Sequence, residues 1–117
     1  KRIAAGRQPH RADGFYVVAQ GYEGEWKARM FAPDLGVTED PATGSAAVAL
    51  AGTLALEAAQ RGESGDLHWP IHQGVEMGRP SLLMASATVQ AGVVTAVRVG
   101  GHAVAVSTGQ LHIPAGG

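Results

Sequence analysis

Residues 44–62 read GSAAVALAGTLALEAAQRG, and this stretch decides the fold. Up to Glu57 every side chain in it is small or aliphatic, so no polar stripe is available to face water. Gly62 readily adopts the left-handed conformation that ends helices. The sequence therefore predicts a helix over residues 44–62, roughly 25 Å long, with the rest of the domain packed around all of its sides.

Strand-like stretches flank this helix. Aromatic and β-branched residues fill 14–20, and apolar and basic residues alternate over 26–31. Further stretches of this kind cover residues 68–73, 81–90, 93–99 and 102–113. Glycine-containing turns at 90–93 and 100–101 are typical of hairpins, and residues 32–43 have the composition of a loop. The pattern predicts an α+β fold in which a curved, mostly antiparallel sheet wraps around one central apolar helix.

Composition limits the class of protein. With 117 residues the chain is long enough for a single domain over 1–117, with a core over 14–114 and a loose tail over 115–117. Apolar residues make up 45% and charged residues 16%, which is typical of a globular protein. A net charge of -1 excludes the basic surface of a nucleic-acid-binding protein.

The absence of cysteine excludes disulfides, thiolate metal sites and thiol nucleophiles within this chain. The uncharged run over residues 41–56 is shorter than the roughly 20 residues of a membrane-spanning helix, so we expect no membrane segment. The chain starts with Lys1 and has no signal sequence behind it. We therefore expect a cytoplasmic protein of which an upstream part is missing.

The chemistry concentrates just before the helix. Asp40 precedes its N-terminus, where unpaired N–H groups, the helix dipole and the hydroxyls of Thr43 and Ser45 favour an anion such as a substrate carboxylate. Gly44 allows close approach to the backbone. Asp40 would then carry a proton or bind an amine or hydroxyl of the same molecule. The simpler interpretation is an ordinary N-cap, for which Ser, Thr and Asp are all common.

Three strings occur in order: EDPATGSA at 39–46, HQGVEMGRPS at 72–81 and GGHAVAVSTGQLHIP at 100–114. Together they resemble the C-terminal half of the PhzF-like phenazine-biosynthesis proteins, which belong to the diaminopimelate-epimerase-like structural group. The resemblance covers nearly the whole chain from Gly14 onward. It implies one half of a pseudo-symmetric two-domain protein with its active site in the cleft between the halves.

Members of that family isomerise small carboxylated molecules by moving a proton, without a cofactor or metal. The resemblance implies that the principal glutamate and a histidine lie in an N-terminal half that is not in this chain. It also implies that Asp40 is a catalytic carboxylate and that Gly44 and Ser45 bind the substrate carboxylate, with Thr43 beside them. The expected partners are that N-terminal half, in the same protein or in a separate subunit, and a second protomer in a dimer.

Relatives in the structural group that use two thiols carry a cysteine where this chain has Thr43, so racemisation by a thiol pair is excluded here. His68 and His72 are separated by Pro70, which favours a strand over a helical metal-binding pair. Two other functions stay open: a non-catalytic small-molecule binding module, and a structural half-domain that associates with itself. In the isomerase interpretation the chain is inactive alone, and its substrate is not specified.

Overall fold

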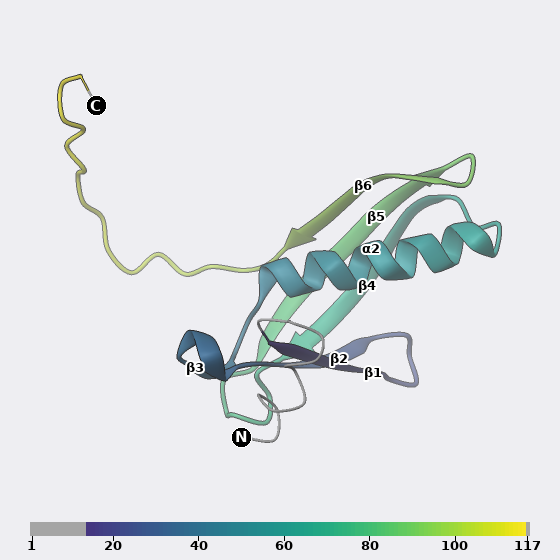
Figure 1. Cartoon of the computed structure of the whole chain (residues 1–117), viewed down its shortest axis with the longest axis horizontal. Coiled ribbons are helices and arrows are strands. Elements are labelled where there is room, and N and C mark those ends of the chain that lie inside the picture. The colour runs from purple at the N-terminus through teal and green to yellow at the C-terminus, as the bar shows by residue number, and fades with distance from the viewer. Residues whose placement is uncertain (1–13, 117) are drawn as a thin grey trace.

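The computed structural model describes residues 14–116, in which one long helix lies against a six-stranded mixed sheet (Figure 1). The elements in chain order are β1 (Phe15–Gln20), β2 (Trp26–Ala32), the short 3-10 helix η2 (Pro33–Leu35), β3 (Val37–Asp40), α2 (Gly44–Gln60), β4 (Gly65–Gln73), β5 (Ser81–Gln90) and β6 (Val93–Gly100). The predicted α+β class is therefore confirmed. The predicted helix begins at the expected residue, and Gly62 beyond its end has a left-handed φ of 83°.

The sheet has the strand order β1-β2-β4-β5-β6, and β3 pairs with β2. All neighbours are antiparallel except β2 and β4, so the mostly antiparallel sheet is confirmed. The β5–β6 hairpin closes through Ala91 and Gly92, which both have positive φ, as a two-residue hairpin turn requires. The predicted loop 32–43 was partly wrong, because Val37–Asp40 pairs with β2 as a short strand.

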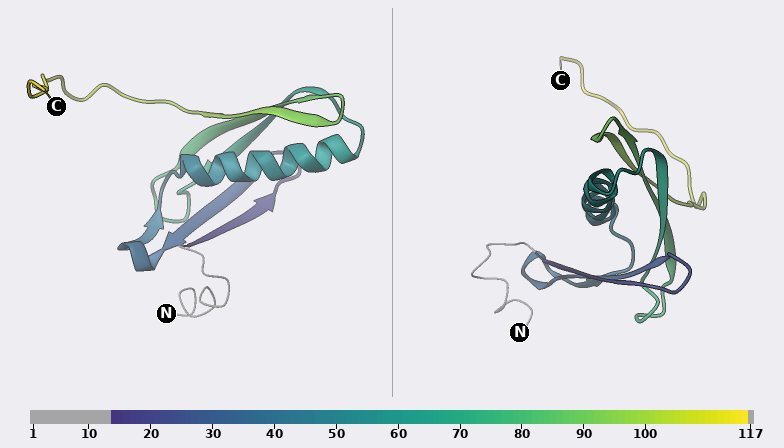
Figure 2. Two further views of the ribbon diagram at one scale, coloured as in Figure 1. Left: turned by 45° about the horizontal axis from the view of Figure 1, so that its top comes forward. Right: turned by 90° about the vertical axis from the view of Figure 1, so that its right-hand side faces the viewer.

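The helix α2 is buried along one stripe only. Ala47, Ala51 and Ala55 are completely buried at a spacing of four residues, and their small side chains let the helix lie close to the sheet. Leu56, on another face, is 58% exposed. The sheet curves around one side of the helix and leaves the other open (Figure 2), so the expectation of burial on every side was wrong. An all-apolar helix does not specify which of its faces is covered. Within residues 14–116 no helix is long and apolar enough to cross a membrane.

The core lies between α2 and the concave face of the sheet. On the sheet side it is built from alternate residues of the strands, which point to one face. The buried apolar residues of the two core clusters are Ala28, Ala47, Ala51, Ala55, Ile71, Leu83, Ala85, Ala87 and Val89. Tyr16 packs against the first cluster, and burial raises the pKa of its hydroxyl. Small residues dominate both sides, so the helix and the sheet approach closely.

The expected strand over residues 102–113 is wrong. After β6 the chain leaves the sheet, and every described residue from Gly101 to Gly116 is exposed and outside any strand (Figure 1). Neither Gly100 nor Gly101 has the positive φ of a tight hairpin turn, so the chain does not fold back along β6. The core therefore ends near Gly100 and not at residue 114; residues 1–13 and 117 of the predicted domain lie outside the described residues.

The one-sided burial of α2 is testable by adding volume to each face. Ala51→Leu inserts three carbons into a filled space and is expected to destabilise the domain by about 1–3 kcal/mol. Ala49→Leu makes the same change on the exposed face and is expected to alter stability by less than about 0.5 kcal/mol. Urea unfolding followed by circular dichroism measures both. Equal losses from the two substitutions would contradict one-sided burial.

Candidate functional site

The side chain of Gln73 ties the start of the helix to the sheet. Gln73 is the last residue of β4 and is completely buried. Its Nε2 donates to the carbonyl oxygen of Asp40 at 2.8 Å and to Thr43 Oγ1 at 2.9 Å. Its Oε1 accepts from the backbone N–H of Thr43 at 3.2 Å. One amide thus fixes both ends of the short segment between β3 and α2.

Asp40 is oriented by Thr43. Thr43 Oγ1 donates to Asp40 Oδ2 at 2.6 Å while it accepts from Gln73. Thr43 occupies the N-cap position, yet its side chain makes no capping hydrogen bond. The ordinary N-cap interpretation therefore does not describe Thr43. Its hydroxyl donates to Asp40 instead. The predicted catalytic residue and one of the predicted substrate-binding residues are therefore hydrogen-bonded to each other.

Glu39, the other carboxylate before the helix, is engaged elsewhere. Arg29 on β2 forms a two-point pair with it, Nε to Oε2 at 3.1 Å and NH2 to Oε1 at 2.9 Å. The hydrogen bond to Glu39 raises the pKa of Arg29, and the guanidinium also lies 5.0 Å from the centre of the Phe31 ring. Neighbouring residues of a strand point to opposite faces of the sheet. Glu39 points to the face of Arg29, so Asp40 points to the other face, on the side of the helix.

The N-terminus of α2 is open to a ligand. Its first internal backbone bond runs from the N–H of Ala47 to the carbonyl of Thr43 at 3.1 Å. The N–H groups of Gly44, Ser45 and Ala46 therefore have no acceptor within the helix. Gly44 and Ser45 are exposed. Unpaired N–H groups and the positive end of the helix dipole attract an anion, so the predicted carboxylate-binding residues are accessible to one.

Gly44 lines a hollow of about 560 Å³ at this end of the helix. The other walls come from the segment between β3 and α2, from the chain before and within β5, from the end of β6 and from the two residues after β6: Ala42, Pro80, Ser81, Leu82, Leu83, Val99, Gly100, Gly101 and His102. Sequence reasoning did not select Ser81 or His102, although each falls within one of the family-like strings. His102 is the only titratable side chain of the lining. Thr43 and Ser45 lie next to lining residues in the chain and Asp40 lies two residues before Ala42, but none of the three is part of the wall.

Position 74, directly after Gln73, requires a glycine. Its φ is +82°, and a side chain there would collide with the carbonyl oxygens of Arg79 and Pro41. Arg79 N–H donates to the carbonyl of Gly74 at 2.9 Å and closes the turn between β4 and β5. Gly74 therefore lets this turn lie against Pro41. Two strings far apart in the sequence meet at this point.

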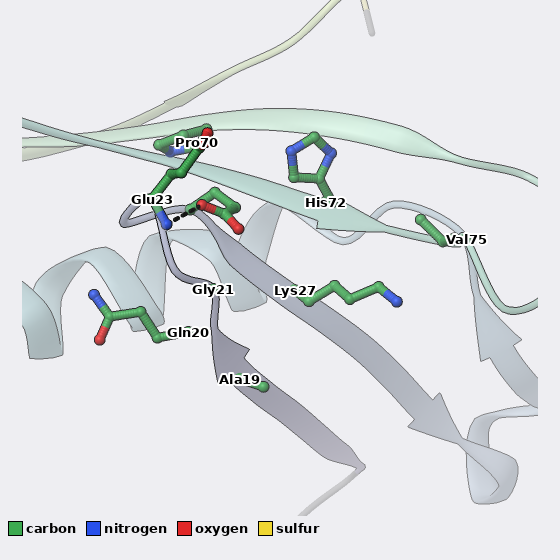
Figure 3. A pocket seen from close by; sticks show the side chains of 9 residues that line it. Ala19, Gln20, Gly21, Glu23, Lys27, Pro70, His72 and Val75 are labelled. Carbon is green, nitrogen blue, oxygen red and sulfur yellow. Dashed lines mark hydrogen bonds between the residues drawn. The ribbon is translucent and has the colours of Figure 1, made fainter.

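A larger hollow, of about 690 Å³, lies at the β1–β2 turn (Figure 3). It contains none of the predicted site residues. Lys27 in its wall pairs with Glu76 at 3.1 Å; a backbone hydrogen bond, and then this lysine, lower the pKa of Glu76. It lies between a hairpin and β4 and has no helix terminus in its wall, and the Glu25 carboxylate there accepts from the N–H of Glu23 at 3.0 Å within the β1–β2 turn. We therefore assign the candidate site to the smaller hollow at the start of α2.

The histidine pair of β4 is not part of either a helix or a metal cluster. His68 and His72 are both exposed on the strand. Within residues 14–116 no group of three or more side chains of the usual metal-binding types comes together. No residue of the candidate site is therefore assigned to a metal.

The role of Gln73 predicts a large loss of stability on Gln73→Leu. Leucine fills the space but leaves the N–H of Thr43 and the carbonyl of Asp40 without their partner, at an expected cost of about 2 kcal/mol or more. Gln90→Leu, on an exposed glutamine of β5, is the matched control and should change stability by less than about 0.5 kcal/mol. Chemical unfolding of the three proteins measures this; indistinguishable midpoints would contradict the role of Gln73.

Comparison with known proteins finds similarity over a region that includes the candidate site. The model of the family described as "Phenazine biosynthesis-like protein" matches residues 8–109. An uncharacterized isomerase of Mesorhizobium japonicum is 46% identical over 92 residues, which cover 79% of this chain and 30% of that protein. Trans-2,3-dihydro-3-hydroxyanthranilate isomerases of Pseudomonas chlororaphis and Pseudomonas fluorescens are 47% and 44% identical over 88 residues, covering 74% of this chain and 30% of each relative.

The chain thus spans about three tenths of the length of these curated relatives. The matched region contains the Asp40–Thr43 pair, Gln73 and the start of α2, so the contacts described above lie inside the shared sequence. The strings at 39–46 and 72–81 lie wholly within the residues that the family model matches. This chain belongs to the phenazine biosynthesis-like family.

Proposed function

We propose that this chain is the C-terminal part of an isomerase that moves a proton on a small carboxylated molecule. The observation that carries the proposal is the 2.6 Å hydrogen bond from Thr43 Oγ1 to Asp40 Oδ2, beside an uncapped helix N-terminus. It combines a positioned carboxylate with an anion site. The names of the relatives, which are isomerases, support this reaction class.

In the proposed mechanism the helix N-terminus holds the substrate carboxylate. The N–H groups of Gly44 and Ser45 and the Ser45 hydroxyl donate to it, and the helix dipole favours its charge. The absence of a side chain at Gly44 permits close approach from the hollow. The carboxylate fixes the substrate so that its reacting carbon is presented to the catalytic groups.

Asp40 acts on the reacting part of the substrate, either by hydrogen-bonding an amine or hydroxyl or by carrying a proton. The Thr43 hydroxyl donates to Oδ2 of Asp40, so the carboxylate keeps one orientation. We therefore assign Thr43 to positioning Asp40, because its hydroxyl hydrogen is already donated to that side chain. A threonine hydroxyl is too weak an acid to exchange a carbon-bound proton itself near pH 7.

The principal base is proposed to lie in an N-terminal half, which together with this chain forms a diaminopimelate-epimerase-like pair of domains around a shared cleft. The chain covers only 30% of the relatives, which is consistent with a shared active site. No cofactor is part of this proposal. The trans-2,3-dihydro-3-hydroxyanthranilate of two relatives is the first substrate to test.

The proposal is tested by combining this chain with the N-terminal half of a relative and following solvent deuterium uptake into trans-2,3-dihydro-3-hydroxyanthranilate by mass spectrometry. Asp40→Asn keeps the shape but removes the proton carrier, so we expect exchange to fall by about 100-fold or more. Ser45→Ala is expected to raise KM with a smaller change in kcat, because it removes a donor to the bound carboxylate.

Asp66→Asn is the matched control, because Asp66 is an exposed carboxylate on β4 that bonds to Thr88 at the other end of the sheet. It should exchange at the rate of the unchanged protein. Exchange that Asp40→Asn leaves unaltered would remove Asp40 from the mechanism. Binding of the substrate to the assembled halves without any deuterium uptake would instead identify a non-catalytic binding module.

A further inference from the structure

The hollow beside Gly44 has a polar side chain in its wall that the proposed mechanism does not use. Ser81 is the first residue of β5 and lines this hollow together with Gly44 of α2. The volume of about 560 Å³ falls within the range of roughly 300–1,000 Å³ that is typical of small-molecule sites. A ligand whose carboxylate binds at Gly44 can therefore place the rest of its body beside Ser81.

The register of the sheet turns Ser81 toward the start of the helix. Ser81 is the direct partner of Gln73 in the antiparallel β4–β5 ladder, and opposite residues of such a ladder point to the same face. Gln73 points to the helix side, where it holds Thr43. Leu83 and Ala85, which follow Ser81 on the same face of β5, are buried against the helix side as well. The Ser81 side chain therefore lies next to the amide that fixes the candidate site.

The hydroxyl of Ser81 is accessible to a ligand. Within residues 14–116 it forms no hydrogen bond with another side chain or with the backbone. Ser81 is only partly buried, so a group that enters the hollow can reach it. His102, the other polar side chain of the wall, is exposed and lies beyond the last strand. Ser81 is therefore the polar side chain of the wall that the sheet holds in place.

Apart from these two residues, the side chains of the wall are apolar. They are Ala42, Pro80, Leu82, Leu83 and Val99, and three glycines contribute only backbone. An apolar wall favours the carbon body of a ligand but discriminates little between its polar substituents. A hydroxyl in such a wall discriminates, because a ligand without the matching group leaves that hydroxyl unpaired. The wall thus suits a carboxylated molecule with a compact carbon body that carries a hydroxyl or an amine.

We propose that Ser81 determines specificity: its hydroxyl hydrogen-bonds a hydroxyl or amine of the bound molecule, while Gly44 and Ser45 hold the carboxylate. The inference rests on the proposed function, because it uses the same anion site. It adds a contact from β5 to the contacts from the start of α2, so two elements hold the ligand. Contacts from two elements fix which way round the ligand lies with respect to Asp40.

Calorimetric titration with three unreactive aromatic acids tests the proposal on this chain combined with the N-terminal half of a relative. Benzoate has a ring and a carboxylate, anthranilate adds an amine, and 3-hydroxyanthranilate adds an amine and a hydroxyl. Ser81→Ala is expected to weaken binding of at least one substituted acid by about 3- to 10-fold, the effect of one hydrogen bond, and to leave benzoate binding within about 2-fold. Ser81→Thr keeps the hydroxyl and should restore the affinity.

Ser86→Ala is the matched control, because Ser86 lies on the same strand but on the opposite face of the sheet. It should leave all three affinities unchanged. The unfolding midpoint of Ser81→Ala should equal that of the unchanged chain, because no hydrogen bond within residues 14–116 is lost. A lower midpoint with unchanged affinities would assign Ser81 a structural role and overturn the proposal.

The remaining outcomes separate the role of Ser81 from the proposed isomerase activity. Equal weakening of all three acids by Ser81→Ala, or weakening of none, would overturn the role of Ser81 even if deuterium uptake shows an active isomerase. Failure of all three acids to bind the unchanged protein would overturn it as well. A loss confined to the substituted acids, without any deuterium uptake, would support the role of Ser81 and contradict the isomerase.

Discussion

The side-chain amide of Gln73 is the interaction on which the site depends. It is the only fully buried polar side chain of the described core, and it donates and accepts at once across the gap between β3 and α2. A buried amide without partners is costly, so its three hydrogen bonds hold the segment in one conformation. Glutamine suits this position because a carboxylate cannot donate and an aliphatic side chain can do neither.

Several features of the site depend on this contact. Thr43 is held by Gln73 and is therefore free of the capping role, so it orients Asp40 instead. The backbone N–H groups at the start of α2 stay available to a ligand, because the side chain of the N-cap residue Thr43 does not bond to them. Gly74, next to Gln73, lets the following turn lie against Pro41. The segments around residues 39–46 and 72–81 are thus two sides of one contact.

Local patterns predicted the parts of the fold that are decided locally. The helix start at Gly44 and the strand Ser81–Gln90 were correct because small apolar runs and period-two alternation are local signals. The short strand β3 was missed because only its backbone pairing with β2 defines it, beside the Arg29–Glu39 side-chain pair. The same limit applies to the site: Asp40 and Gly44 stood out beside a helix start, whereas the role of Gln73 depends on a contact 33 residues away. The open face of α2 and the unpaired segment after Gly100 depend on what surrounds the domain.

Gln73 and Thr43 act as one unit at the start of α2. A double-mutant cycle of unfolding free energies, with Gln73→Leu, Thr43→Val and both together, tests it most directly. We expect the two changes to be coupled by about 1 kcal/mol or more, because each removes the same hydrogen bond and disturbs Asp40. Effects that add to within about 0.3 kcal/mol would contradict it, since independent residues show such additivity.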